Sequence, residues 1–137
     1  MKIKKLLLAT LLVTLFVTIA GMVTCGGFFN WVYKLEPVNV WKPMTGGPAP
    51  LYYIVELFLN LIFVFAYSFF SKGILVNNKY LKGLIYGLIV FSVGMLPGMF
   101  ATYFFQTVNP IVIIYWTIWG AIIKPVQGLI TAAVCEE

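Results

Sequence analysis

The sequence contains no histidine, no arginine and no aspartate. Without an imidazole ring, histidine-ligated haem, histidine-containing zinc sites, serine–histidine triads and imidazole proton relays are all excluded. Without arginine, the chain lacks the forked donor that nucleic-acid-binding proteins favour. These absences remove most familiar enzyme mechanisms, and we expect no enzymatic activity, no cofactor, no metal site and no nucleic-acid partner.

Charge is scarce, whereas apolar residues are abundant. Only 9% of the 137 residues are charged and 62% are hydrophobic, while about a quarter of the residues of a soluble domain are charged. A chain of this length has room for about four membrane spans with short connections, and for no separate soluble domain. The sequence therefore predicts one transmembrane domain over residues 1–137, with the lipid bilayer as its main partner.

Four apolar runs are predicted to span the membrane, at about residues 6–24, 51–70, 82–105 and 110–133. Asn109 followed by Pro110 is typical of a helix start, with a capping side chain and proline at the first helical position. Pro97 predicts a kink near residue 93 of the third run, because proline leaves a backbone carbonyl without its amide partner. The fold class that we predict is all-α: an integral membrane four-helix bundle with up-down topology.

The first apolar run has a second interpretation, because a basic start before an apolar stretch is also typical of a secretory signal. The run is longer than the usual signal core and no A-x-A pattern follows it, so we expect an uncleaved span. A lipoprotein-type signal ending at Cys25 is the alternative. In the predicted topology Cys25 and Cys135 lie on opposite sides of the membrane, so we expect no disulfide between them.

Residues 26–50 form the longest connection, and its prolines and glycines exclude a long continuous helix. Its aromatic residues are typical of the headgroup layer. We interpret it as an external loop that anchors two helices, with a cap over the bundle as the alternative. The excess of lysine on the opposite side predicts that both termini are cytoplasmic, in an inner or cytoplasmic membrane, near anionic lipids. The lysines on that side are Lys2, Lys4, Lys5, Lys72, Lys79 and Lys82.

Lys124 lies inside the fourth apolar run, where a lysine costs about 2.5–3.5 kcal/mol to insert. We expect it to face the bundle interior and to donate to Asn60, and the alternative is that it snorkels to the inner headgroups. Glu56 is either a proton or cation site or a structural carboxyl. A direct Glu56–Lys124 pair requires offset or tilted helices, because their depths differ by about 13 Å. The candidate intramembrane polar site consists of Glu56, Asn60, Tyr67, Lys124 and Gln127.

Glycines of the third span fall on one narrow stripe when they are placed at 100° per residue. Small residues allow helices to approach closely in lipid, and we expect this stripe to pack within the chain in preference to forming a dimer seam. Further glycines lie on the polar face of the fourth span, and threonines form a small, mildly polar face on the first. The predicted packing glycines are Gly83, Gly87, Gly94, Gly98, Gly120 and Gly128.

The abundance of packing faces and the lack of catalytic groups favour a non-enzymatic accessory or assembly subunit, in a membrane complex or a homo-oligomer. The alternative is a small transporter or channel whose path is lined by Glu56, Asn60, Lys124 and Gln127, which would require a dimer. An intramembrane enzyme ranks third, because it would need two carboxyls and only Glu36 and Glu56 lie near one mouth.

Overall fold

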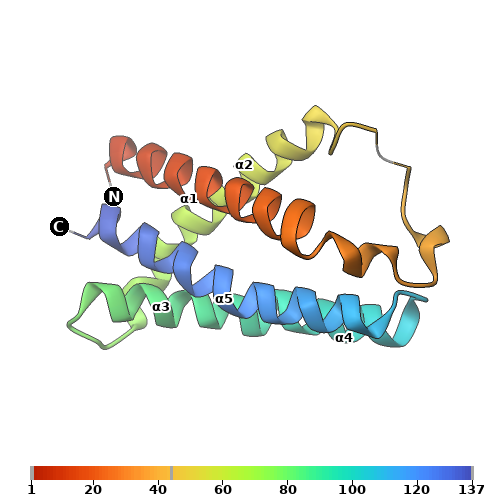
Figure 1. Ribbon diagram of the computed structural model, residues 1–137. Helices are drawn as coiled ribbons and strands as arrows, with labels where there is room; N and C mark the ends of the chain where they lie inside the picture. The colour runs from red at the N-terminus through yellow and green to blue at the C-terminus, as the bar shows by residue number, and fades with distance from the viewer. Residues whose placement is uncertain (1, 44, 137) are drawn as a thin grey trace.

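The computed structural model describes residues 2–43 and 45–136, and within them all regular secondary structure is helical. The long helices run in alternating directions, so that α1 begins and α5 ends at the same end of the molecule (Figure 1). In this part of the chain, four helical units are long and apolar enough to cross a membrane, judged by length and composition. The long helices are α1 (Ile3–Val23), α2 (Pro50–Phe70), α3 (Lys79–Val90), α4 (Leu96–Phe105) and α5 (Pro110–Cys135).

In its described residues, the connection between α1 and α2 contains short helical turns and no long helix, as its prolines predict. α1 continues into a π-helical turn, Thr24–Phe28, and two 3-10 turns follow at Asn30–Lys34 and Val38–Val40. Gly46 and Gly47 have φ angles of +79° and +98°, a region that glycine enters without steric cost. A 3-10 turn, Ser71–Gly73, ends the second helical unit.

Asparagine side chains begin two of the helices. The Asn109 side chain accepts a hydrogen bond from the Ile111 amide at 3.0 Å, and Pro110 follows it, which confirms the predicted start of α5. Asn78 caps α3 in the same way, accepting from Tyr80 and Leu81 at 2.9 and 3.2 Å. The start of α3 was not predicted from Asn78, although an asparagine before a helical run is a capping signal.

Helices α3 and α5 pack with their backbones in contact at glycines. A Cβ atom placed on Gly87 would overlap the carbonyl oxygen of Lys124, and one placed on Gly83 would overlap that of Gly128. Both contacts are with backbone atoms, which no side-chain rotation relieves. Gly83, Gly87 and Gly128, which we predict as packing positions, lie at this contact. Gly120 also packs, against the side chain of Met95.

Gly94 and Gly98 do not pack within the chain, so the prediction of one continuous glycine stripe is wrong for these two positions. A Cβ atom on either would meet nothing within 4 Å among the described residues. The physical reason is a π-helical turn, Phe91–Met95, at the place where Pro97 predicted a kink. A π turn takes in an additional residue and rotates the following helix by about 100°. The rotation places Met95 against α5 and turns the two glycines away.

Helix α2 crosses α1 and α5 obliquely (Figure 1), and its two halves have different surroundings. The first half is open, with Leu51, Ile54 and Phe58 each at least 60% exposed. The second half has one buried face, with Phe63, Val64 and Tyr67, and the Tyr86 hydroxyl of α3 donates to the Phe63 carbonyl oxygen at 2.7 Å. The best-packed core therefore lies toward the end that holds both chain termini. Its members are Ala9, Val13, Phe63, Val64, Tyr67, Tyr86 and Ala132.

Candidate functional site

Three helices are joined by a chain of amide hydrogen bonds. Gln127 of α5 donates from Nε2 to Oδ1 of Asn60 at 3.0 Å, and Asn60 of α2 donates from Nδ2 to Oγ1 of Thr14 at 3.1 Å. Gln127 is 0% exposed and Asn60 is 5% exposed. In an apolar medium such bonds contribute about 0.6–2 kcal/mol each. We call Thr14, Asn60 and Gln127 the amide bridge.

One atom of the amide bridge has no hydrogen-bond partner among residues 2–43 and 45–136: the side-chain oxygen of Gln127, which is buried. Thr131 bonds elsewhere on the same residue, since its hydroxyl donates to the Gln127 backbone carbonyl at 2.8 Å. A buried acceptor without a partner costs about 1–3 kcal/mol. The bridge is therefore satisfied toward α2 and unsatisfied at its α5 end.

Glu56 lies one turn from Asn60 on α2 and bonds to α1. Its carboxylate accepts a hydrogen bond from the Thr18 hydroxyl at 3.1 Å, in the same way that Asn60 bonds to Thr14. The side chains on both helices are four residues apart, so that they repeat on one face. The threonine face predicted on the first span is thus the surface that receives the polar face of α2.

Lys124 does not donate to Asn60, and that prediction is wrong. The Asn60 amide is bonded to Thr14 and Gln127, and the Lys124 ammonium lies 5.6 Å from the centre of the Phe63 ring. No hydrogen bond or salt bridge of Lys124 is found in the described part of the chain, although the Glu56 carboxylate is close enough to act on it electrostatically. A cation over an aromatic face gains about 0.5–2 kcal/mol. Lys124 therefore faces α2, with its ammonium group over the Phe63 ring.

Tyr67 does not belong with the other candidate polar residues. It is buried, but its hydroxyl donates to the Glu136 carboxylate at 2.6 Å, beyond the end of α5. Lys82 forms a salt bridge with the same carboxylate at 3.3 Å, and the Lys79 ammonium donates to the Glu136 backbone carbonyl at 3.1 Å. Glu136 thus joins α2 and α3 to the end of α5. Sequence reasoning missed this residue, because a glutamate beyond a helix carries no periodic signal.

An aromatic cluster joins the 26–50 connection to the beginning of α5. The Trp116 indole donates to the Tyr33 hydroxyl at 2.8 Å, and Trp41 packs edge-on against both rings. Phe29 stacks on Tyr115 at 5.0 Å between ring centres. Burial raises the pKa of the Tyr33 phenol above its ordinary value, so the phenol stays protonated. These contacts support the interpretation of the connection as an anchor for two helices.

These sites consist of charged and amide side chains that are held by hydrogen bonds and aromatic contacts among apolar residues. Among residues 2–43 and 45–136, no three histidine, cysteine or acidic side chains lie close enough together to hold a metal ion. The two cysteines, Cys25 and Cys135, are free. Glu36 bonds to the Val38 amide in the connection at 3.2 Å, and Glu56 bonds to Thr18, so the two carboxyls have different partners.

No protein-family model matches the chain, and neither a curated protein nor a solved structure is significantly similar to it.

Proposed function

We propose that this chain is a multi-pass integral membrane protein with both termini in the cytoplasm, and that it serves as a non-enzymatic accessory or assembly subunit. It joins a membrane complex, or further copies of itself, through a helix surface that its own fold leaves uncovered. The main support for this proposal is that some of the small and polar residues hold the chain's own helices together, while others are left uncovered. The amide bridge and Gly87 hold the helices of the chain together, whereas a Cβ atom placed on Gly94 or Gly98 would meet nothing within 4 Å in the described residues.

The use of the polar groups supports a structural role. Two of the four residues of the alternative transport path, Asn60 and Gln127, bond to one another and are closed to solvent within the chain. Glu56 bonds to Thr18 of the neighbouring helix. In lipid, helices associate through close van der Waals contact at small residues and through such inter-helix hydrogen bonds.

Gly98→Leu should weaken assembly while leaving the chain folded. Among the described residues, the Cβ atom of a leucine here would meet no other element within 4 Å, but the side chain would hold a partner helix away from the α4 backbone. We expect the species seen on native gels of mildly solubilised membranes to shift to lower mass, with an unchanged melting temperature for the purified chain. Leu88→Ala, a change at an exposed position on α3, is the control and should preserve the assembly. An unchanged native mass for Gly98→Leu would contradict the proposed surface.

The orientation predicts an asymmetric labelling result. In a variant with Cys25 and Cys135 replaced by serine, single cysteines are introduced at Asn39 and Asn77, which are both exposed. A membrane-impermeant maleimide should modify position 39 in intact cells, and position 77 only after the membrane is opened. This follows from the lysine excess at the end that holds the termini. Labelling of position 77 in intact cells, with protection of position 39, would show that the orientation in the membrane is the opposite one.

One observation favours the transporter alternative: in the described part of the chain the Lys124 ammonium has no hydrogen-bond partner, and neither does the buried Gln127 oxygen. Lys124→Met removes a charge without leaving a bonded side chain unpaired, so we expect the unfolding free energy to change by less than about 1 kcal/mol. Thermal melting in detergent measures this. A loss above about 2 kcal/mol would mean that the ammonium has a polar partner. For a transporter, the same variant and Glu56→Gln would both lose proton flux in reconstituted vesicles.

A further inference from the structure

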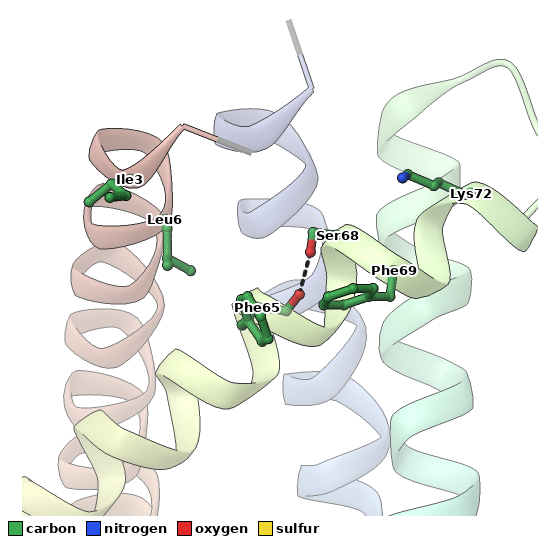
Figure 2. Close-up of a pocket in the computed structure, with 6 residues that line it drawn as sticks. All are labelled: Ile3, Leu6, Phe65, Ser68, Phe69 and Lys72. Atoms are coloured by element: carbon green, nitrogen blue, oxygen red, sulfur yellow. Dashed lines mark hydrogen bonds between the residues drawn. The ribbon is translucent and has the colours of Figure 1, made fainter.

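A groove of about 360 Å³ lies between the first turns of α1 and the last turns of α2. Figure 2 shows its lining, with Ile3 and Leu6 on the α1 side and the α2 side chains opposite them. The walls are mostly apolar. Ser68 is already bonded, because its hydroxyl donates to the Phe65 carbonyl oxygen at 2.7 Å. The lining residues are Ile3, Leu6, Phe65, Ser68, Phe69 and Lys72.

Lys72 is the charged residue in this lining, and Figure 2 shows its side chain extending toward the side where Ser68 lies. It is exposed, and no carboxylate pairs with it in residues 2–43 and 45–136. Glu136, the described acidic side chain at this end of the molecule, is bonded to Lys82 and Tyr67. Positive charge at the mouth of the groove is therefore left uncompensated within the described chain.

The start of α1 adds to this charge. Lys2 and Lys4 are exposed and lie on either side of Ile3 in the sequence, and Ile3 itself lines the groove. A lysine close to an anionic leaflet contributes about 1 kcal/mol to attraction toward its phosphates. The groove thus combines an apolar lining, which suits a hydrocarbon chain, with the charged Lys72 side chain, which suits a negatively charged headgroup.

We infer that this groove binds an anionic phospholipid, with one acyl chain between α1 and α2 and its phosphate on the Lys72 ammonium. The inference rests on the proposed membrane location, since within a bilayer a lateral groove is filled by lipid. Uncompensated lysine selects an anionic headgroup over a zwitterionic one. Lys2 and Lys4, the exposed sequence neighbours of Ile3, supply further positive charge at the start of α1.

Native mass spectrometry of the full-length protein tests this binding. The protein in mild detergent is incubated with equal amounts of phosphatidylglycerol and phosphatidylcholine that have identical acyl chains. We expect phosphatidylglycerol to be retained in preference, and Lys72→Gln to weaken its retention about fivefold, the factor expected for one juxtamembrane lysine. Lys42→Gln, an exposed lysine in the other connection, is the matched control and should bind as the unchanged protein does. Equal retention of the two lipids, or Lys72→Gln equal to the control, would overturn the inference.

Two additional measurements separate the acyl chain from the headgroup. Ser68→Leu fills the groove without changing the charge, and it should reduce retention of phosphatidylglycerol as strongly as Lys72→Gln does. Inorganic phosphate at millimolar concentration should bring no stabilisation in thermal melting, whereas phosphatidylglycerol should raise the melting temperature. Undiminished lipid retention in Ser68→Leu, or a rise in melting temperature with phosphate alone, would contradict the proposal that an acyl chain binds in the groove. The native mass in the same spectra reports on assembly, so loss of lipid binding and loss of the proposed subunit contacts are distinguishable.

Discussion

Gly87→Ala is expected to lower the unfolding free energy of the protein by about 3 kcal/mol, at the upper end of the usual cost of overpacking. The added Cβ atom would overlap the carbonyl oxygen of Lys124 and lie against the backbone of Pro125. Backbone atoms in two packed helices cannot turn aside, so α3 and α5 must move apart. At about 3 °C per kcal/mol for a chain of this size, the melting temperature should fall by about 10 °C.

Gly98→Ala is the matched control, because it makes the same chemical change on the same helical unit. The new methyl group at Gly98 would have no atom within 4 Å in the described residues, and alanine favours a helix over glycine by up to about 1 kcal/mol. The two substitutions should therefore have opposite signs when both proteins are unfolded in the same detergent. Similar melting temperatures for the two variants would mean that α3 and α5 do not meet at Gly87.

Asn60→Leu is expected to cost about 2 kcal/mol, because it breaks both bonds of the amide bridge. The side-chain oxygen of Gln127 already has no partner in the described chain, and without Asn60 its Nε2 group loses its acceptor as well. A whole buried amide would then be unpaired, and each unsatisfied buried group costs about 1–3 kcal/mol. Thermal melting or denaturant titration in detergent measures the loss. Leu59→Ala, at an exposed neighbouring position, should lie within about 0.5 kcal/mol of the unchanged protein.

The double variant Asn60→Leu/Gln127→Leu gives the sharper test. Gln127→Leu removes the whole side-chain amide of Gln127: its oxygen, which has no partner in the described chain, and its Nε2 group, which Asn60→Leu would leave unpaired. The double variant should therefore lose less stability than the sum of the two single variants, by about 1 kcal/mol. Additive losses would show that Asn60 and Gln127 do not bond to one another in the folded protein.

The contrast between Gly87 and Gly98 shows which packing positions helical periodicity can predict and which it cannot. A regular helix places both on one face, and the presence of Pro97 was sufficient to predict a kink between them. The form that it takes, a π-helical turn, was not predictable, because the additional residue depends on how the helix packs against α5. Because of the added rotation, Met95 lies on the face that packs against α5, and Gly94 does not.

The polar residues show the same division. The positions of Glu56, Asn60 and Gln127 on inward faces followed from counting residues along each helix. Their partners did not, because a hydrogen bond joins atoms from helices whose relative height and tilt are set by packing. Depth alone paired Lys124 with Asn60, whereas in the structure Gln127 is bonded to Asn60 and Lys124 lies over Phe63.

The sequence by itself determined the all-helical class, four apolar segments long enough to cross a membrane, and the capped start of α5. These features depend on composition and on contacts within a few residues, which local physical chemistry controls. Only the tertiary structure decided that α2 crosses obliquely, that Glu136 joins three helices, and that Gly94 and Gly98 are left uncovered. Each of these depends on the rotation and tilt of one helix against another, and side chains far apart in the chain set those angles together.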